Sequence, residues 1–189
     1  MRVIGGTYRS RRLAAPRGLA TRPTSDRLRE TLFNVLAPRI EGAVFADLYA
    51  GSGAVGIEAI SRGASLVYFV DSSPAAVAAI RSNLAALKIT SGFQILSSTV
   101  SAALRRLTAG SPQDRCSVIL LDPPYAAGND YAGTLNGIGH GADSLLTPDG
   151  IVIAEHSRNM LQPLAESYGP LKRYRVLEQG DAGLSFYTR

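Results

Sequence analysis

Residues 43–63 read AVFADLYAGSGAVGIEAISRG, and this stretch decides the fold class. Its first eight residues form an apolar run that fits a buried strand, and the glycine-rich turn after it leads into a short helix that Gly63 ends. A strand, a glycine turn and a helix in this order make up the first half of a βαβ unit. The stretch therefore predicts a parallel sheet that is covered by helices.

The chain beyond this stretch keeps alternating between strand and helix. Apolar runs predict further strands at residues 65–71, 92–98, 116–122 and 150–156, with helices at 72–87, 99–110 and 134–146 between them. The last two predicted strands, at 169–180 and 182–189, are joined by the turn QGDAG and form an antiparallel hairpin. We expect a doubly wound α/β fold with a seven-stranded, mostly parallel sheet that ends in this hairpin.

Basic charge is concentrated at the N-terminus of the chain. Residues 1–40 hold nine arginines and two acidic residues, whereas the remaining 149 residues hold eleven basic and thirteen acidic groups. Arginine binds phosphate through paired hydrogen bonds and stacks on bases, so this distribution indicates a contact with nucleic acid. We expect residues 1–24 to form a basic arm with a small β-hairpin, and residues 25–189 to form the sheet domain, which begins with a helix capped by Ser25.

The composition is typical of a single globular domain in a reducing compartment. The chain has 189 residues, 46% of them apolar, and no stretch approaches the roughly 20 apolar residues of a membrane span. The N-terminus lacks the apolar core of a secretory signal, and the single cysteine, Cys116, rules out an internal disulfide. We therefore expect a cytoplasmic protein without a membrane partner, in which Cys116 is a small core residue.

Candidate binding residues follow the predicted strands, because ligands of doubly wound sheets bind at the carboxyl ends of the strands. Asp47 closes the first strand, and the turn at residues 51–53 exposes backbone N–H groups at the start of a helix. Asp71 ends the second strand 18 residues after Gly53, where an acidic residue typically holds the ribose hydroxyls of a nucleoside. This pattern fits NAD and other adenosine-containing cofactors equally well.

The fourth predicted strand ends in a motif that distinguishes these cofactors. Residues 122–125 read DPPY, and the two prolines fix the backbone dihedral angle φ. Asp122 and the carbonyl of Pro123 can accept hydrogen bonds from an amine on a planar base, which orients the nitrogen lone pair for attack. Tyr125 offers a ring on which that base can stack, a contact worth roughly 1–3 kcal/mol. The motif therefore favours transfer of a group to an exocyclic amine.

These motifs together resemble a known family. The stretch DLYAGSGAVGIEAISRGA, followed by Asp71 and DPPY, resembles class I S-adenosylmethionine-dependent methyltransferases that modify exocyclic amines. The segments RVIGGTYRSRRLAAPRG and TRPTSDRLRETLFNVL are similar to those of the bacterial RsmD-like enzymes, which methylate N2 of guanine 966 in 16S ribosomal RNA. The resemblance runs from Arg2 to about His156.

The resemblance implies the fold, the cofactor and the reaction. It implies a Rossmann-like class I methyltransferase fold with strand order 3-2-1-4-5-7-6, S-adenosylmethionine as methyl donor, and 16S ribosomal RNA, within a small-subunit particle, as substrate. It also implies direct in-line transfer, with no metal and no covalent enzyme intermediate. Nothing in the sequence demands a dimer, so we expect a monomer.

The resemblance also assigns roles to residues of this chain, although Ser98 and Thr99 stand where the family has an acidic residue near the adenine. The predicted catalytic residues are Asp122, Pro123 and Tyr125. The predicted cofactor-binding residues are Asp47, Tyr49, Gly51, Ser52, Gly53, Asp71, Ser72, Ser98, Thr99 and Asp122. The predicted RNA-binding residues are Arg2, Arg9, Arg11, Arg12, Arg17, Arg22, Thr24 and Tyr125.

Four other functions stay open on the sequence. An adenine-N6 methyltransferase acting on DNA or RNA would use the same DPPY chemistry. A protein glutamine methyltransferase usually has asparagine in place of Asp122 and lacks an arginine-rich arm. An NAD-dependent oxidoreductase leaves DPPY and the arm without a role, and a non-catalytic ribosome-binding factor leaves the double proline without one.

Overall fold

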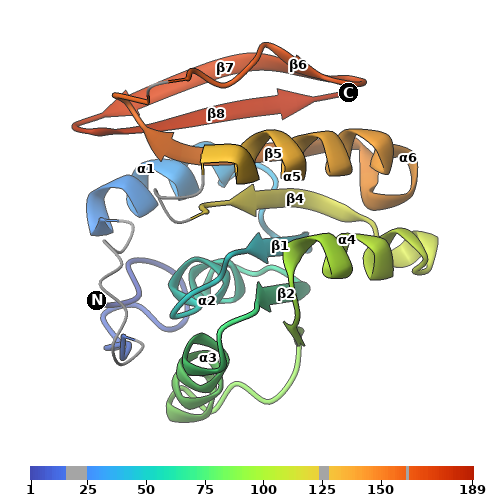
Figure 1. Cartoon of the computed structure of the whole chain (residues 1–189). Coiled ribbons are helices and arrows are strands. Elements are labelled where there is room, and N and C mark those ends of the chain that lie inside the picture. Colours follow the sequence, from blue (N-terminus) through green and yellow to red (C-terminus); the bar gives the residue numbers. More distant parts are fainter. Residues whose placement is uncertain (16–24, 124–127, 161) are drawn as a thin grey trace.

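The computed structural model describes residues 1–15, 25–123, 128–160 and 162–189. The described residues form one eight-stranded sheet in the order β3-β2-β1-β4-β5-β8-β7-β6 (Figure 1). Its strands are β1 (Val44–Leu48), β2 (Leu66–Asp71), β3 (Phe93–Ser97), β4 (Cys116–Leu121), β5 (Leu146–Ser157), β6 (Ser167–Tyr168), β7 (Leu171–Gln179) and β8 (Ala182–Thr188). Strands β1 to β5 are parallel, whereas β8, β7 and β6 are antiparallel to their neighbours.

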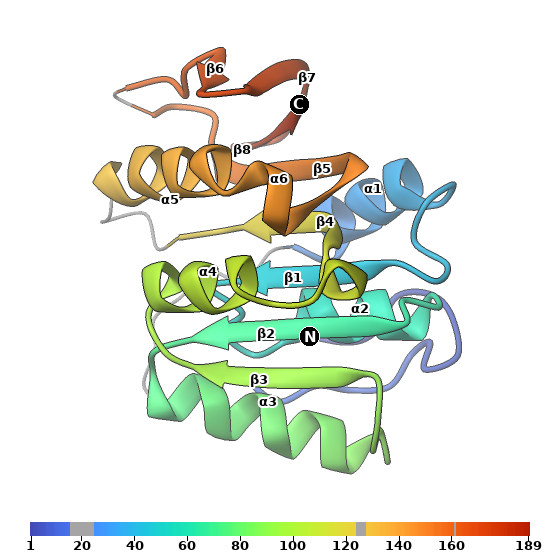
Figure 2. The same ribbon diagram turned by 90° about the vertical axis from the view of Figure 1, so that its right-hand side faces the viewer.

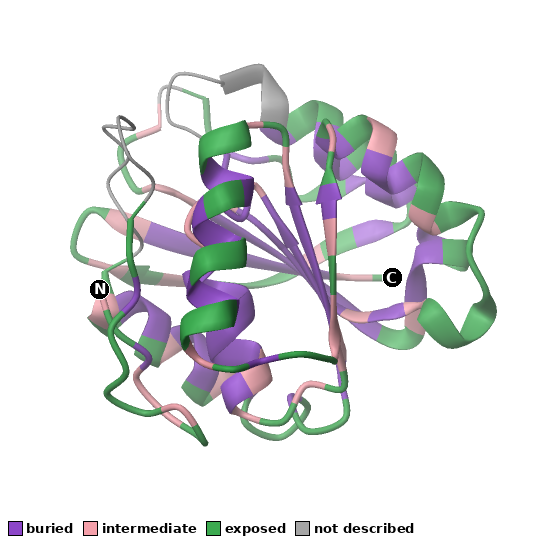
Figure 3. Ribbon diagram, turned by 90° about the horizontal axis from the view of Figure 1, so that it is seen from below, coloured by how far each residue is buried: buried purple, intermediate pink, exposed green. Residues whose placement is uncertain are grey.

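Helices cover both faces of the sheet. They are α1 (Asp26–Leu36), α2 (Ala54–Ser61), α3 (Pro74–Ala86), α4 (Val100–Thr108), α5 (Gly128–His140) and α6 (Ala142–Leu145), with a 3-10 turn, η1, at Pro112–Asp114. Helices α1, α2 and α3 pack into one buried apolar cluster, and α4, α5 and α6 into a second one on the opposite face (Figure 2). The helices turn buried residues toward the sheet and exposed residues outward (Figure 3).

Hydroxyl side chains start three of these helices at the positions that the sequence favours. The hydroxyls of Ser25, Ser73 and Thr99 accept hydrogen bonds from backbone N–H groups in the first turns of α1, α3 and α4. Such caps satisfy N–H groups that have no partner within a helix. Ser73 is followed by Pro74, whose fixed φ suits the first helical position.

The predicted fold is confirmed, with differences at its edge. The seven predicted strands occur in the expected order. Strands β7 and β8 are the sixth and seventh predicted strands, so the observed order β5-β8-β7 corresponds to the expected 5-7-6. A two-residue strand, β6, is added beyond β7. The helix predicted at 134–146 instead begins at Gly128 and breaks at Gly141 into α5 and α6. Cys116 is buried in the core, as expected.

The described part of the N-terminal arm is folded onto the domain, and its two ends pair with each other over a short stretch, where the Val3 N–H donates to the Arg11 carbonyl and the Ser10 N–H to the Val3 carbonyl, both at 2.9 Å. Arg2 and Arg12 form one isolated antiparallel bridge instead of two regular strands. Val3 and Leu13 are buried in the same apolar cluster as α1 and α2. The glycines and arginines of this segment supply few apolar side chains, and the N–H groups of Ile4, Gly5 and Tyr8 donate to side chains of α2. Among the described residues, no helix is both long and apolar enough to cross a membrane.

Candidate active site at the carboxyl edge of the sheet

Three carboxylates meet where the carboxyl ends of β2, β1 and β4 lie side by side. Asp71 is the last residue of β2, Asp47 precedes the last residue of β1, and Asp122 directly follows β4. Strand β1 pairs with β2 on one side and with β4 on the other. The chain winds in opposite directions from β1, so this edge is the switch point at which such sheets bind ligands.

Asp47 is buried behind the glycine turn, with an exposed fraction of 3%. Its Oδ2 accepts a hydrogen bond of 2.9 Å from the backbone N–H of Gly56, in the first turn of α2. The pKa of Asp47 is raised to about 7, mainly by burial; the Gly56 hydrogen bond lowers it, and the nearby charges of Asp122 and Asp71 raise it. This position holds the turn against the strand, and contact of Asp47 with a cofactor stays a prediction.

Asp71 joins the glycine turn to the start of α3. Its Oδ2 accepts a hydrogen bond from the backbone N–H of Gly51, and its Oδ1 accepts one from that of Ser73, both at 2.8 Å. A carboxylate has about four acceptor positions, so two remain for a ligand. Asp71 is half-buried, whereas Ser72, which follows it, is exposed. The predicted ribose-binding acid and the predicted cofactor turn therefore form one connected unit.

The glycines of the turn differ in what surrounds them. Gly51 and Gly53 have φ angles of +55° and +75°, which side chains rarely adopt. A Cβ atom at Gly53 would lie 3.1 Å from Ile80, whereas one at Gly51 would meet nothing nearer than a backbone oxygen at 4.0 Å. The side of Gly51 where a Cβ would lie is thus open to a ligand. This opening, the N–H groups that start α2 and the half-buried Asp71 fit the methionine and ribose parts of S-adenosylmethionine.

Tyr49 and Thr99 are occupied by contacts within the protein. Tyr49 has a φ of +66°, and its hydroxyl lies 2.8 Å from that of Thr134 in α5. The Thr99 hydroxyl caps α4, and the Ser98 hydroxyl donates to the Thr99 carbonyl at 3.3 Å. The cap explains why this strand end carries hydroxyls, because a helix begins at once. A role of Ser98 and Thr99 toward the adenine stays a prediction.

The described half of the DPPY motif lies at the expected place. Asp122 is half-buried and Pro123 is buried, directly after β4. Tyr125 of the same motif lies outside the described residues, as do Arg17, Arg22 and Thr24. The remaining arm arginines, Arg2, Arg9, Arg11 and Arg12, are exposed. The Arg2 side chain forms an ion pair of 3.4 Å with Asp26 at the start of α1.

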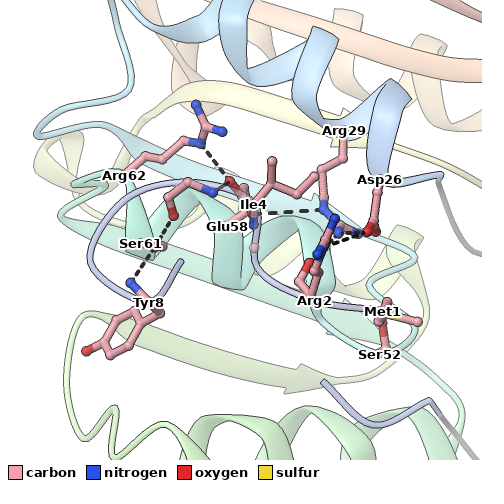
Figure 4. A network of polar contacts seen from close by, with 12 residues as sticks. Met1, Arg2, Ile4, Tyr8, Asp26, Arg29, Ser52, Glu58, Ser61 and Arg62 are labelled. Atoms are coloured by element: carbon pink, nitrogen blue, oxygen red, sulfur yellow. Dashed lines mark hydrogen bonds and ion pairs between the residues drawn. The ribbon is translucent and has the colours of Figure 1, made fainter. Parts of the chain in front are cut away.

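A buried polar network that the sequence did not reveal fixes the arm to α2 (Figure 4). Both carboxylate oxygens of the fully buried Glu58 accept from the arm, at 2.7 Å from the N–H of Ile4 and 2.8 Å from that of Gly5. Arg62 donates to the same carboxylate at 2.7 Å, and the buried Arg29 lies 3.9 Å from it. A lone acid in an apolar helix was the available signal, but sequence spacing cannot name its partners.

A second set of hydrogen bonds, made by Asn83, joins the arm directly to the glycine turn. The buried Asn83 of α3 accepts from the N–H of Ala14 at 2.8 Å and donates to the Ala14 carbonyl at 3.0 Å. Its amide nitrogen also lies 2.9 Å from the carbonyl of Ser52, whose hydroxyl contacts the sulfur of Met1 at 3.1 Å. The predicted cofactor residue Ser52 is thus held from two sides by groups that order the arm.

The family described as "Conserved hypothetical protein 95" matches residues 1–188. The chain belongs to this family. It is 36% identical over 189 residues to "Putative rRNA methyltransferase YlbH" of Bacillus subtilis, covering all of this chain and 99% of that protein. It is also 39% identical over 128 residues to "Ribosomal RNA small subunit methyltransferase D" of Escherichia coli, covering 68% of this chain and 62% of that one.

Solved structures agree with this membership. The structure named "Putative methyltransferase yhhF from Escherichia coli" superposes with a TM-score of 0.80 at 30% identity, covering 100% of this chain and 97% of that chain. The resemblance to RsmD-like enzymes and the class I methyltransferase fold predicted from the sequence are therefore confirmed.

Proposed function

We propose that this protein uses S-adenosylmethionine to methylate the exocyclic N2 amine of one guanine in 16S ribosomal RNA, the base at position 966. One observation carries the proposal: the glycine turn and Asp122, which can accept a hydrogen bond from an amine, lie at the same edge of the sheet. Strands β1 and β4 are paired in parallel with Leu48 opposite Leu121, so the glycine turn and Asp122 follow neighbouring strand ends. The rRNA methyltransferase names of the relatives support the substrate class.

The chain's own groups bind and orient, because S-adenosylmethionine supplies a methyl group on a positively charged sulfur that is already a strong electrophile. The open backbone at Gly51 would hold the methionine part, and the free acceptor positions of Asp71 would hold the ribose hydroxyls. The Asp47 carboxyl supports this turn from behind through Gly56. The residues that contact the cofactor therefore need little rearrangement to receive it.

Asp122 and Pro123 would act on the attacking amine. The lone pair of an exocyclic amine is delocalised into the base, so hydrogen bonds from the amine to the Asp122 carboxylate and the Pro123 carbonyl orient it toward the methyl group. The nitrogen becomes much more acidic once it carries the methyl group. Asp122 therefore need not be a strong base, and the proton can leave to it or to water after the transfer.

The arm would supply the electrostatic contact with RNA. Arg9, Arg11 and Arg12 are exposed and lie on a segment that is fixed to the domain by Glu58 and Asn83. Exposed arginines at fixed positions can bind phosphates without first being ordered, which favours affinity. We infer a cytosolic monomer that acts on a small-subunit particle, with residues 1–24 as its RNA-binding arm.

The experiment uses Asp122→Ala with Asp114→Ala as the matched control, because Asp114 is an exposed acid next to the other end of β4. The substrate is small-subunit RNA from a strain that lacks the gene. Asp122→Ala should methylate about 100-fold more slowly or worse at saturating cofactor, with cofactor affinity measured separately by calorimetry, and Asp114→Ala should match wild type. Mass mapping identifies the modified base. Full activity of Asp122→Ala would refute its role, and a methyl group on adenine N6 would establish the alternative enzyme class.

A further inference from the structure

The strand β7 carries basic and aromatic side chains on the outer part of the sheet. Residues 172–175 read KRYR. Tyr174 and Val176, with exposed fractions of 52% and 44%, are the exposed large hydrophobic residues of the described chain. Lys172 and Arg175 are exposed, and neither forms an ion pair within the part of the chain that the structure describes. Cations and an aromatic ring thus share one short surface.

A β-bulge fixes the orientation of two of these side chains. The register of β7 against β8 shifts between Arg173 and Arg175, so that Tyr174 is the extra residue. The Tyr174 ring lies 6.2 Å from that of Phe186, and the Arg175 guanidinium lies 5.8 Å from the same ring. The tyrosine and the arginine are therefore held next to each other while Tyr174 stays half exposed.

The sheet register places this surface close to the proposed methyl-transfer edge. Leu120 pairs with Ile153, Ile153 with Phe186, and Phe186 with Arg175, so Arg175 lies in the same row as the last but one residue of β4. Three strand spacings of about 4.8 Å put it roughly 15 Å away across the sheet. Phe186, the ring next to which Tyr174 and Arg175 lie, belongs to the apolar cluster on the face that the arm also covers.

Protection of the sheet edge does not explain the composition of this surface. Lysine, arginine and a bulge on an outer strand do deter pairing with a second chain. The exposed Tyr174 and Val176 between them have the opposite effect, because they offer apolar surface to a partner. An arginine next to an exposed ring, without an acidic partner among the described residues, matches what single-stranded RNA requires: a charge for phosphate and a face for stacking.

We propose that Lys172, Tyr174 and Arg175 form a second RNA-binding surface that holds the RNA flanking the target base. The inference rests on the proposed function and adds a contact to it. RNA whose target base reaches Asp122 needs to extend about 15 Å along the sheet to reach this surface. The arm and β7 would then hold the substrate from both sides of the methyl-transfer edge.

The test compares Tyr174→Ala/Arg175→Ala with Arg158→Ala. Arg158 is an exposed arginine near the same hairpin, but it is already paired with Glu178 at 3.1 Å. Binding to naked 16S RNA and to small-subunit particles is measured at several salt concentrations, together with kcat, KM, cofactor affinity and Tm. We expect the RNA affinity of the double variant to fall about tenfold and its KM for RNA to rise about tenfold, with kcat and cofactor affinity within about twofold of wild type. With Arg175→Ala alone, log affinity should fall less steeply with log salt, and the slope should become smaller in magnitude by about 0.7–0.9.

Conservative and second variants keep the test decisive. Tyr174→Phe should bind RNA like wild type, since it keeps the stacking face, and Lys172→Glu replaces the double variant if that variant's Tm falls. The inference would be overturned by unchanged RNA affinity or by an equal loss in Arg158→Ala. It would also be overturned by a loss seen only with particles, which would indicate a protein partner, or by a wild-type dimer that the double variant dissociates, which would indicate a second copy. Absence of methylation by wild type would refute the proposed function instead.

Discussion

Asp47 lies at the strand edge near two other carboxylates, and burial raises its pKa to about 7. The unfolded chain releases this proton near pH 4, whereas the folded protein keeps it up to about pH 7. Folding therefore binds a proton in this interval, and the contribution of Asp47 to stability is lost as the pH rises through it. At neutral pH and above, the protein holds an ionised carboxylate in its interior.

Asp47→Asn tests this directly, because asparagine still accepts the Gly56 hydrogen bond but cannot ionise. The free energy of unfolding of the variant, relative to wild type, should rise between about pH 4.5 and about pH 8 by on the order of 3 kcal/mol. Urea unfolding at both pH values measures it. Asp149→Asn, at an exposed position, should show no such change. A difference between Asp47→Asn and wild type that did not vary with pH would contradict the burial argument.

At the scale of elements, the packing of α2 on β2 depends on a glycine. Gly56 lies in the first part of α2, and a Cβ atom there would lie 2.3 Å from a ring carbon of the fully buried Phe69. Gly56, the third glycine of the turn motif, thus allows the helix to pack closely on the strand, whereas Gly51 leaves one side of the turn open to a ligand. The same three-glycine pattern therefore contains one position for a ligand and one for the core.

Gly56→Ala should lower the free energy of unfolding by about 1–3 kcal/mol, although alanine usually favours a helix. Gly133→Ala in α5 is the matched control, because its Cβ would have no neighbour within 4 Å. This control should gain roughly 0.5–1 kcal/mol from helix propensity alone. Denaturant unfolding of both variants decides, and equal stabilisation by the two would show that α2 can shift away from β2 at little cost.

Local patterns predicted the strands and most helix starts because each depends on neighbours in sequence. The apolar run before Asp71 and the serine before Pro74 are examples. The break of the predicted helix at Gly141 and the two-residue strand β6 were missed, since both depend on packing between distant segments. The N-terminal hairpin was predicted from local pattern, but only its ends pair with each other, and Ile4 and Tyr8 between them bond to α2.

For the whole molecule, Glu58 is the point at which arm and domain are joined. Its carboxylate accepts from the backbone of Ile4 and Gly5 and neutralises the buried Arg29 and Arg62. Two buried nitrogens of Arg29, Nε and Nη1, have no hydrogen-bond partner among the described residues. The buried ion pair of Glu58 and Arg29 is costly to break, because removing one partner leaves the charge of the other buried.

Glu58→Gln should release the arm and weaken RNA binding, although it removes a negative charge and would strengthen binding by charge alone. The amide keeps one acceptor oxygen for two backbone N–H groups, and Arg29 then keeps only its ion pair of 2.9 Å with Asp26 among the described residues. Hydrogen exchange of the Ile4 and Gly5 amides should accelerate, and RNA affinity should fall about tenfold. Glu41→Gln, at an exposed site, should bind RNA as well as wild type or better. Tighter binding by Glu58→Gln would argue against the arm as an RNA contact.

The sequence by itself determined the parallel sheet, the residues at its carboxyl edge and the basic arm, because each is written in short patterns of a few adjacent residues. Only the tertiary structure decided that Asp47 is buried while Gly51 is open, that Glu58 and Asn83 fix the arm, and that Tyr174 lies in reach of the edge. The bonds of Glu58 and Asn83 to the arm join residues that are 50 or more positions apart, as Glu58 and Ile4 are by 54. Burial and charge pairing at such distances arise when the chain packs, and no local pattern encodes them.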